Sequence, residues 1–280
     1  MSVDVDAGLE YWAQQTADAD GVLGGFGSGS LPRVESLGSR LFLLRLLPEL
    51  CTVASALKPL QHTPSCRTRA LDVGAGIGRV TADTLLYFFD DVVLLEPAFH
   101  FIQAAVARGR ASEAATSTTA PLALPGRPRP LKGIADRTKS VTFLQGTLQD
   151  FDPARPHHAN MLERVGYVPD ATDALDGFDV VWCQWCLGHL AADDLVAFLR
   201  RSHAALRNKE RSLIVVKENL CSDKPDGSAE VIFDEQDSSL TRSDRAWKDA
   251  FEAAGLTLVQ EQVQEGLPEG LYVVKMYALQ

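Results

Sequence analysis

The sequence predicts an α/β fold built on one doubly wound, mostly parallel, seven-stranded sheet, with an N-terminal helical cap and a β-hairpin insertion. Apolar runs of strand length alternate with stretches of helical periodicity from residue 68 to residue 278. The runs are almost continuously apolar, which is typical of parallel strands covered on both faces. A glycine-rich turn follows the first run, as it does where such a sheet enters its first helix. The length of 280 residues fits one domain, which we expect to span residues 1–280.

The first 55 residues predict a helical cap over the sheet. Leu9 and Trp12 stand in a polar helical background over residues 4–19, and the glycines of residues 20–27 interrupt that helix. A helical pattern resumes over residues 33–50, where leucines recur at helical spacing. Both segments precede the first core strand, so we expect residues 1–55 to lie outside the alternating units.

The core elements follow in order and alternate between strand and helix. The last two apolar runs are too close in sequence for a helical crossover, so at least one of them is expected to be antiparallel. The expected strands are 68–73, 91–95, 141–144, 178–183, 211–217, 256–263 and 271–278, and the expected helices are 78–89, 98–109, 192–207 and 242–254.

Two stretches interrupt this alternation. Residues 110–140 are rich in Ala, Ser, Thr, Pro and Arg, and residues 153–177 are polar. We expect both to be flexible surface insertions that carry no core. The basic run over residues 127–132 could contact RNA or an acidic partner, and a solvated loop is the simpler interpretation.

The charge balance is acidic, because 27 Lys and Arg stand against 37 Asp and Glu and give a net charge of −10. Phosphate binding needs clustered cations, so nucleic acid is not an expected partner. No apolar run approaches the roughly 18 residues of a membrane span, and the chain starts without a basic, apolar signal sequence. We therefore expect no membrane association and a cytoplasmic protein, with the nucleus as a second location.

The five cysteines are an odd set without the spacing of a disulfide framework, which fits free thiols in a reducing compartment. Cys183 and Cys186 form a C-x-x-C pair, which raises the question of a zinc or redox site. No second pair accompanies them, and they stand at a strand end rather than at a helix start. We therefore expect no metal.

The glycine-rich turn carries the first sign of chemistry. Its glycines Gly74, Gly76 and Gly78 follow an acidic residue as G-x-G-x-G, whereas the fingerprint of nicotinamide enzymes is G-x-G-x-x-G. The observed spacing is the one used by S-adenosylmethionine (SAM) methyltransferases, and it argues against a nicotinamide oxidoreductase. A purely structural strand-to-helix turn is the alternative.

Glu96 ends the next apolar run, 18 positions after Gly78. A carboxylate at the tip of the second strand accepts hydrogen bonds from both hydroxyls of a ribose. The alternative is a solvated acid at a strand end. Together with the glycine turn, Glu96 predicts a bound SAM whose adenosine lies between the two.

Further polar residues gather where the fourth and fifth strands end. Gln184, Trp185 and His189 follow the fourth strand, and Asn219 follows the fifth. Asp226 and Gly227 predict the turn of a hairpin over residues 220–233 whose return strand is 231–233, above the active site. The acidic run of residues 234–239 comes next and could bind a cation or supply bases. Standing alone, His189 could equally be a structural histidine.

The chain closely resembles the protein alpha-N-terminal methyltransferases, which have a Rossmann-like class I SAM methyltransferase fold. The resemblance covers nearly everything outside the two insertions. It departs from the family at Glu96, where an Asp is commoner, and at Glu218, where an Asp is often found. It rests on Tyr11-Trp12, residues 20–27, Ser39-Arg40, residues 71–79, residues 148–151, Gln184-Trp185, residues 188–190, residues 217–219, residues 234–239, Leu267-Pro268 and Tyr272.

The resemblance implies a role for each candidate residue. His189 and Asp237 match the proposed catalytic base pair. Trp185, Asn219, Asp234 and Tyr272 match the peptide channel, while Trp12 and Leu23 belong to the segment that closes over the substrate. Expected at the cofactor are Gly74, Gly76, Gly78, Arg79, Glu96, Pro97, Ala98, Leu148, Gln149 and Gln184.

The resemblance also implies the reaction, the transfer of methyl groups from SAM to the free α-amine of proteins that begin Xaa-Pro-Lys or Xaa-Pro-Arg after Met removal. The products would be mono-, di- or trimethylated N-termini, ribosomal or chromatin proteins would be typical substrates, and the enzyme would be a monomer. Two alternatives stay open. One is a small-molecule N- or O-methyltransferase, and the other is a catalytically silent SAM-binding interaction protein, against which the intact pair of His189 and Asp237 argues.

Overall fold

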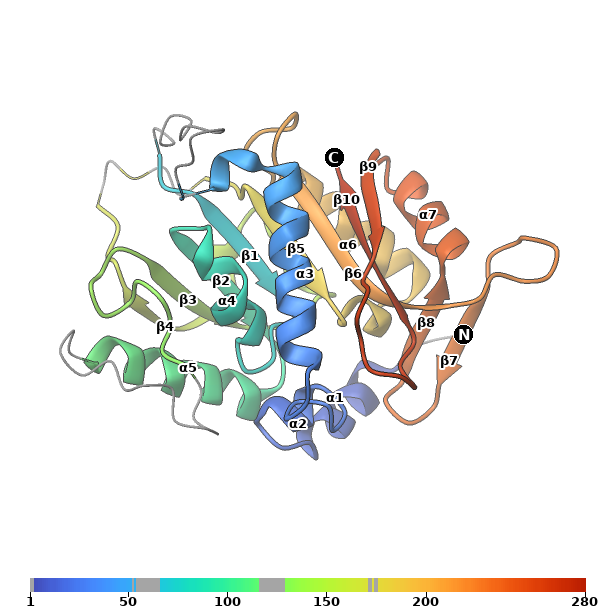
Figure 1. Cartoon of the computed structure of the whole chain (residues 1–280), viewed down its shortest axis with the longest axis horizontal. Helices are drawn as coiled ribbons and strands as arrows, with labels where there is room; N and C mark the ends of the chain where they lie inside the picture. Colours follow the sequence, from blue (N-terminus) through green and yellow to red (C-terminus); the bar gives the residue numbers. More distant parts are fainter. Residues whose placement is uncertain (1–2, 52, 54–65, 116–128, 171–172, 174–175) are drawn as a thin grey trace.

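A computed structural model describes residues 3–51, 53, 66–115, 129–170, 173 and 176–280 of the protein. Its centre is one sheet with the strand order β4-β3-β2-β1-β5-β6-β10-β9 (Figure 1). Neighbouring strands from β3 to β6 run parallel, which confirms the expected doubly wound, mostly parallel α/β fold. These parallel strands are β1 (Arg69–Val73), β2 (Asp91–Glu96), β3 (Ser140–Gln145), β5 (Val180–Gln184) and β6 (Leu213–Cys221).

Antiparallel strands complete both ends of the sheet. β10 (Val273–Leu279) runs antiparallel to β6, and β9 (Leu258–Val263) runs antiparallel to β10, which confirms the expectation for the last two runs. At the other end, β4 (Asn160–Gly166) runs antiparallel to β3. With the pair β7 and β8 the sheet has ten strands within the described residues, so the expected number of seven was too low.

Helices cover both faces of the sheet. Phe42 and Leu43 of the helix that crosses in front of the sheet in Figure 1 pack with the helices after β1 and β2. Phe198 and Trp247 lie in a second apolar cluster on the opposite face. The first face carries α3 (Leu31–Leu46), α4 (Arg79–Asp83) and α5 (Phe99–Ala114), and the second carries α6 (Ala192–Ala204) and α7 (Asp244–Ala253). Short 3₁₀ turns are η1 (Pro48–Leu50), η2 (Leu85–Tyr87), η4 (Pro156–His158) and η5 (Leu187–His189).

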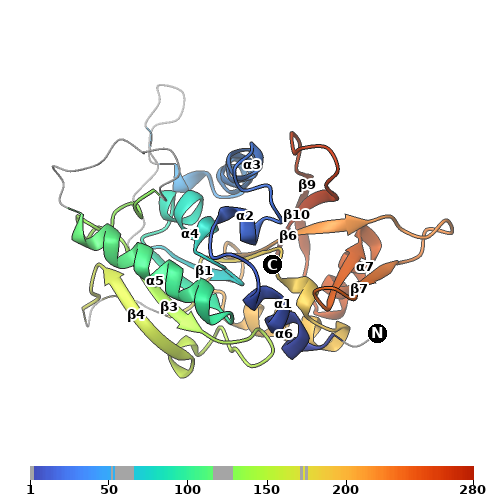
Figure 2. The same cartoon turned by 90° about the horizontal axis from the view of Figure 1, so that it is seen from below.

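The N-terminal cap consists of α1 (Val5–Ala13), α2 (Ala19–Val22) and α3. The side chain of Asp4 begins α1 by accepting the N–H groups of Asp6 and Ala7, and Asp18 begins α2 by accepting the N–H of Gly21. In Figure 1 the arrows of β1 and β5 point toward the end of the molecule where α1 and α2 lie, and Figure 2 shows that end from below, with α1 and α2 in front. Helices α1 and α2 of the cap therefore cover the carboxyl ends of the parallel strands, while α3 lies on one face of the sheet. No helix in the described part of the chain is long and apolar enough to cross a bilayer.

The two stretches expected to carry no core contribute to it. Residues 116–128, 171–172 and 174–175 lie outside the described residues, so the flexibility expected of them stays a prediction. In the described parts, Leu131, Ile134 and Val165 are buried in the same apolar cluster as Phe143. The expectation is wrong there, because Val165 belongs to β4, which covers the edge of β3, and because Leu131 and Ile134 fold into the core just before β3 begins.

The hairpin expected over residues 220–233 has a different pairing. β7 (Val231–Asp234) pairs antiparallel with β8 (Ser239–Ser243), and β8 lies between β7 and the end of β6. Residues 226–227 do turn the chain, but the acidic run after Asp234 forms the hairpin turn. The buried guanidinium of Arg242 in β8 bonds to two backbone carbonyls near the end of β5, and this contact keeps β8 beside β6. The helix expected from residue 242 therefore begins at Asp244.

Candidate active site

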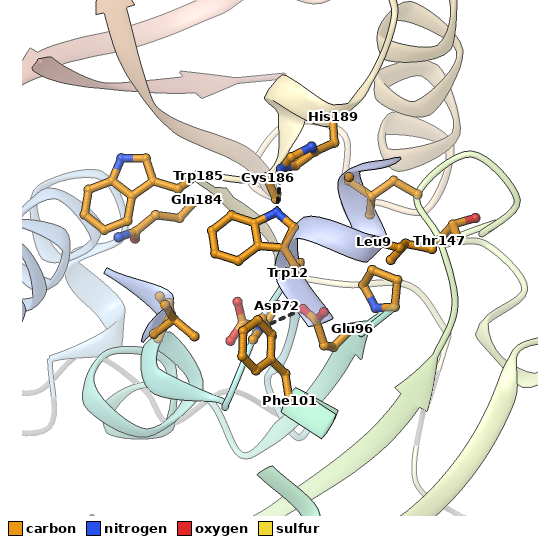
Figure 3. A pocket seen from close by; sticks show the side chains of 18 of the residues that line it. Leu9, Trp12, Asp72, Glu96, Phe101, Thr147, Gln184, Trp185, Cys186 and His189 are labelled. Carbon is orange, nitrogen blue, oxygen red and sulfur yellow. Dashed lines mark hydrogen bonds between the residues drawn. The ribbon is translucent and has the colours of Figure 1, made fainter. Parts of the chain in front are cut away.

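A cavity opens at the carboxyl ends of the parallel strands, beneath α1 and α2 (Figure 3). Brändén's rule places ligands at this end of a doubly wound sheet. Most of the predicted site residues line this one cavity, although they come from distant parts of the chain. They are Trp12, Gly74, Gly76, Arg79, Glu96, Pro97, Leu148, Gln149, Gln184, Trp185 and His189.

The glycine turn forms one wall of the cavity. Gly74 and Gly76 have φ angles of 60° and 56°, in the left-handed region where a side chain causes strain. A Cβ on Gly74 would lie 2.3 Å from Cβ of Cys186, so the close approach of two turns also requires glycine there. Asp72 fixes the start of α4 by accepting the N–H and the hydroxyl of Thr81 at 2.9 and 2.6 Å. The turn is therefore held rigidly against the sheet.

Glu96 closes the turn from the tip of β2. Its two carboxylate oxygens accept the N–H of Gly76 and the N–H of Ala98, both at 2.8 Å. Burial raises the pKa of Glu96 to about 7, although these hydrogen bonds favour the charged form. Each oxygen keeps a second lone pair, so the carboxylate still has acceptors for two hydroxyls of a ligand.

Seven predicted residues do not line the cavity, and three of them, Gly78, Ala98 and Leu23, belong to the elements around it. Gly78 caps α4, where a Cβ would meet Cδ1 of Leu94 at 3.1 Å, so this glycine allows α4 to pack on the sheet. Ala98 begins α5 and is buried, and its contribution is the N–H that holds Glu96. Leu23 is buried in the turn after α2. Their expected contact with cofactor or substrate stays a prediction.

The turn after β5 presents Trp185 and His189. Trp185 has a φ angle of 55°, which is strained for an aromatic residue, and its backbone N–H donates to the carbonyl of Lys217 at 3.1 Å. Oε1 of Glu218 accepts the N–H groups of both Cys186 and Leu187 at 2.9 Å. From the other side Arg242 donates to the carbonyls of Leu187 and Leu190. The turn after β5 is thus held by Glu218 through its backbone N–H groups and by Arg242 through its backbone carbonyls.

His189 lies at the top of the cavity, opposite the indole of Trp12 (Figure 3). Nε1 of Trp12 donates to Nε2 of His189 at 3.0 Å, so Nδ1 carries the proton of the neutral imidazole. Burial lowers the pKa of His189, while the negative charge of Asp237 acts to raise it. The net shift is downward, so the imidazole stays neutral near neutral pH.

Asp237 does not line the cavity and makes no hydrogen bond to His189 in the described residues. Its Oδ1 accepts the N–H of Ser239 in the β7–β8 turn at 3.1 Å. Helix α1 lies between the two groups, since a Cβ on Gly8 would sit 3.2 Å from the carbonyl oxygen of Asp237 and 3.4 Å from Nδ1 of His189. The two residues are near neighbours across α1, but they are not in direct contact.

The remaining predicted substrate residues lie beside the cavity, along the edge formed by β6, β7 and β10. Asn219 of β6 pairs with Val274 of β10, Asp234 ends β7, and Tyr272 is exposed just before β10. Burial raises the pKa of Tyr11, and the charges of Asp237 and Asp234 raise it further. The field at this edge is therefore negative.

The loop after β3 forms the remaining wall. Nε2 of Gln149 donates to the carbonyl of His189 at 3.0 Å, which links this loop to the turn after β5. Arg201 of α6 donates to the carbonyls of Leu148, Gln149 and Phe151 at 2.9 to 3.1 Å. These contacts hold Leu148 and Gln149 at the cavity from below.

Several lining residues were not predicted. Phe101 of α5 lies below the indole of Trp12 (Figure 3), and Val5, Leu9 and Val22 of the cap also line the cavity. Gly8 was also missed, although a glycine inside a helix is costly and signals close contact. Behind the cavity Glu35 of α3 is fully buried and bonds to Arg79 and Gln184. A lone acid in an amphipathic helix gives no signal of burial, so the sequence offers no means of finding it.

Comparison with known proteins gives consistent matches. The family model described as AdoMet dependent proline di-methyltransferase matches residues 3–123 and 132–280. Alpha N-terminal protein methyltransferase 1 of Arabidopsis thaliana is 34% identical over 272 residues, covering 97% of this chain and 78% of that protein. The Schizosaccharomyces pombe protein of the same name is 33% identical, covering 97% and 93%. Human N-terminal Xaa-Pro-Lys N-methyltransferase 1 is 32% identical, covering 96% and 92%.

Solved structures agree with these matches. A SAM-dependent methyltransferase from Leishmania major superposes with a TM-score of 0.67 and is 28% identical, covering 99% of this chain and 82% of that one. The 1,6-didemethyltoxoflavin-N1-methyltransferase of Burkholderia thailandensis, solved with S-adenosylhomocysteine, has a TM-score of 0.50 and 18% identity, covering 88% and 77%. The second likeness concerns the fold alone.

Proposed function

Because the chain belongs to the family of AdoMet-dependent proline di-methyltransferases, we propose that it methylates the free α-amine of proteins that begin Xaa-Pro-Lys or Xaa-Pro-Arg. Relatives named for this activity match nearly the whole chain at 32 to 34% identity. The structural observation that carries the proposal is His189, a neutral imidazole at the wall of the cofactor cavity, next to an acidic edge. A basic group and a negative field are what a cationic peptide terminus requires.

The cofactor is S-adenosylmethionine, which supplies a methyl group on a sulfonium sulfur. The residues of the cavity fit it. Glu96 offers acceptors for the ribose hydroxyls, and Arg79 offers a cation for the carboxylate. Leu148 and Phe101 provide apolar walls for the adenine ring of SAM. Trp185 also lines the cavity, and its Nε1 is buried without a hydrogen-bond partner among the described residues.

The chemical task of the protein is to deprotonate the amine. An α-amine has a pKa of about 7.7–8.0, so most of it enters protonated at neutral pH and has no lone pair. Nε2 of His189 is the basic nitrogen at the cavity, and we propose that it takes this proton once the indole of Trp12 has moved away. Asp237, which faces the opposite side of α1, stabilises the imidazolium that forms. Repeated cycles require the base again each time, giving mono-, di- and trimethylated products.

The acidic edge accounts for the sequence preference of this proposal. Asp234 is exposed at the end of β7, where its carboxylate would attract a Lys or Arg at the third position of the peptide. Asn219 and Tyr272 lie along the same edge and would line the path of the peptide. Proline at the second position has no amide N–H, so a site without an acceptor at that point tolerates it. Ribosomal and chromatin proteins with such termini are the substrates we propose.

The test is a methylation assay on synthetic peptides, read by mass spectrometry. A peptide that begins Ala-Pro-Lys should gain three methyl groups, and a peptide that begins Pro-Pro-Lys should gain two. The same Ala-Pro-Lys peptide with an acetylated N-terminus should gain none, since its α-nitrogen is an amide whose lone pair is delocalised into the carbonyl group and does not attack the methyl group. Methylation of the acetylated peptide would place the target on a side chain and would contradict the proposal.

A second arm tests the acidic edge. Replacing the third residue by Glu should abolish methylation, and Asp234→Asn should raise KM for the Lys peptide more than it lowers kcat. Equal rates of the wild-type protein on the Lys and Glu peptides would contradict the role of the edge. A protein that binds SAM but modifies none of the peptides would instead be a small-molecule methyltransferase or a silent binding protein.

A further inference from the structure

Glu35 is a fully buried carboxylate in the middle of an ionic cluster behind the cofactor cavity. It lies on α3, and its exposed fraction is 0%. One oxygen forms a short ion pair with Nη1 of Arg79. The other accepts from Nε2 of Gln184 at 2.9 Å and from Nζ of Lys217 at 3.1 Å. One cap residue thus holds groups from three separate elements, α4, β5 and β6.

Two of these partners face the cofactor. Arg79 and Gln184 both line the cavity, and Arg79 is the one permanently charged cation among the lining residues. A guanidinium has five N–H donors in a fixed planar fork. Glu35 accepts from Nη1, and within the described residues the guanidinium of Arg79 makes no other hydrogen bond. The other donors of the fork therefore stay available to a carboxylate in the cavity.

The orientation of Gln184 is fixed by the same contact. Its Nε2 donates to Glu35, and its Oε1 accepts from Nε1 of Trp182 at 3.1 Å. These two contacts settle which end of the amide is the donor. The second N–H of Nε2 remains for another acceptor, and Gln184 lines the same cavity as Arg79.

Lys217 anchors the cluster to the cap. Its Nζ is fully buried and donates to the carbonyl of Glu35, to Oγ of Ser39 at 2.9 Å and to Oε1 of Gln264 at 3.1 Å, besides the carboxylate of Glu35. Burial lowers the pKa of Lys217, and the charge of Arg79 lowers it further. The carboxylate of Glu35 thus lies between the side chains of Arg79 and Lys217 and pairs with both.

We propose that Glu35 is a positioning residue of the cofactor site, whose carboxylate orients Arg79 and Gln184 so that their free donors receive the α-carboxylate of SAM. This inference rests on the proposed function in one respect, that SAM is the ligand of this cavity. It also gives α3 a purpose beyond covering the sheet. The cap helix becomes part of the cofactor site without touching the cofactor, and a change in its packing changes the affinity for SAM.

Comparing the affinity for two ligands distinguishes a positioning role of Glu35 from a merely structural role. The probes are SAM and decarboxylated SAM, which keeps the sulfonium, the amine and the adenosine but lacks the carboxylate. Binding of both to the wild-type protein and to Glu35→Gln is measured by calorimetry. If Glu35 acts through the donors of Arg79 and Gln184, the variant should bind SAM about 10- to 100-fold more weakly. Its affinity for decarboxylated SAM should change by less than about 3-fold.

Two further variants keep the test informative if Glu35→Gln folds poorly. Glu35→Asp retains the charge. Of the change that Glu35→Gln causes in the logarithm of the affinity ratio between SAM and decarboxylated SAM, this variant should restore at least half. Glu49→Gln is the matched control, because Glu49 follows α3 and pairs with Arg211 at the surface. This control should bind both probes like the wild-type protein.

The other outcomes overturn the proposal. Equal weakening toward both probes would mean that Glu35 serves the fold alone. Tighter binding of SAM by Glu35→Gln would mean that Glu35 competes with the carboxylate of SAM for Arg79. Failure of the wild-type protein to bind SAM at all would contradict SAM as the cofactor, and with it the proposed function. This outcome differs from the two above, because it is seen in the wild-type protein and not only in Glu35→Gln.

Discussion

The indole N–H of Trp12 donates a hydrogen bond to Nε2 of His189 across 3.0 Å (Figure 3). This contact joins helix α1 of the cap to the nitrogen that we propose as the base, 177 residues further along the chain. The lone pair that would accept a proton from the substrate is therefore already engaged. For His189 to act as the base, the indole has to leave Nε2, so the position of α1 and the strength of the base are linked.

The first prediction concerns this contact. In the wild-type protein the indole N–H of Trp12 donates to Nε2 of His189 and so favours the neutral imidazole. Trp12→Phe keeps an aromatic ring but removes this donor. The pKa of His189 should therefore rise, by up to about one unit for the loss of one hydrogen bond of 0.5–1.5 kcal/mol. NMR titration of the imidazole measures it. Tyr11→Phe, a change at the neighbouring residue of α1, is the control, and an unchanged or lower pKa in Trp12→Phe would contradict the role of the indole.

The second prediction concerns the acceptor at the ribose. Glu96→Gln keeps one oxygen for the N–H groups of the turn but loses the charge, so SAM should bind about 1–3 kcal/mol more weakly by calorimetry. Because burial raises the pKa of Glu96 to about 7, wild-type affinity for SAM should also fall from pH 8 to pH 6. The variant should show a flatter dependence. Glu163→Gln, at a surface ion pair with Arg110, controls for the loss of an acid.

Much of the fold and one wall of the site could be predicted from the sequence because the signals are local. The core strands are continuous apolar runs. The glycine turn directly follows β1 in the sequence, at the end of the strand where the ligand is expected. β4 and β8 were missed because neither is apolar. β4 carries Asn160, Glu163 and Arg164 at the sheet edge, and β8 is mostly polar. Their pairing is decided by the neighbouring strand rather than by their own composition.

The supports of the site could not be predicted, because their contacts join residues far apart in the chain. Glu35 meets Gln184 and Lys217 across 149 and 182 positions. Gly8 lies against His189 and Asp237 only once α1 has folded back over the sheet. Burial of a charged residue is decided by the partners it finds, and a single sequence does not reveal them.

The third prediction concerns the clamp on the His189 turn. Arg242 donates from two nitrogens to the carbonyls of Leu187 and Leu190, which flank His189. Arg242→Lys keeps the charge but cannot bridge both carbonyls, so kcat should fall about tenfold while the affinity for SAM stays unchanged. Steady-state kinetics and calorimetry measure the two effects. Arg245→Lys, at an exposed pair with Asp249, is the control. A parallel loss of SAM affinity would show that Arg242 supports the whole cavity instead.

The fourth prediction follows from buried acids. Burial raises the pKa of Glu218 to about 7, against an unfolded value of about 4.3. Between these values the folded protein holds a proton that the unfolded chain has lost, so the contribution of Glu218 to stability falls as the pH rises through this window. Glu218→Gln keeps the oxygen that accepts the N–H groups of Cys186 and Leu187. The free energy of unfolding of the variant relative to wild type should therefore increase from pH 5 to pH 8 in urea titrations. A constant difference would place the pKa outside this window.

The last prediction tests the base. His189→Ala and Asp237→Ala should each lower kcat by about 10²–10⁴, because a protonated amine cannot attack, while SAM binding stays near the wild-type value. If the imidazole and the carboxylate serve one proton transfer, the double variant should be little worse than the worse single variant, since groups that share a step are strongly non-additive. Helix α1 separates the two residues in this structure, so this test also asks whether α1 moves aside during turnover.

The pH dependence sharpens the same test. The variants should regain rate between pH 7 and pH 9, where the amine of about pKa 7.7–8.0 loses its proton to water. Wild-type kcat should change less over that range, because the base supplies the neutral amine already. Additive losses in the double variant would assign the two residues to separate steps. Full activity of both single variants at pH 7 would show that water removes the proton and that His189 serves to hold Trp12 in place.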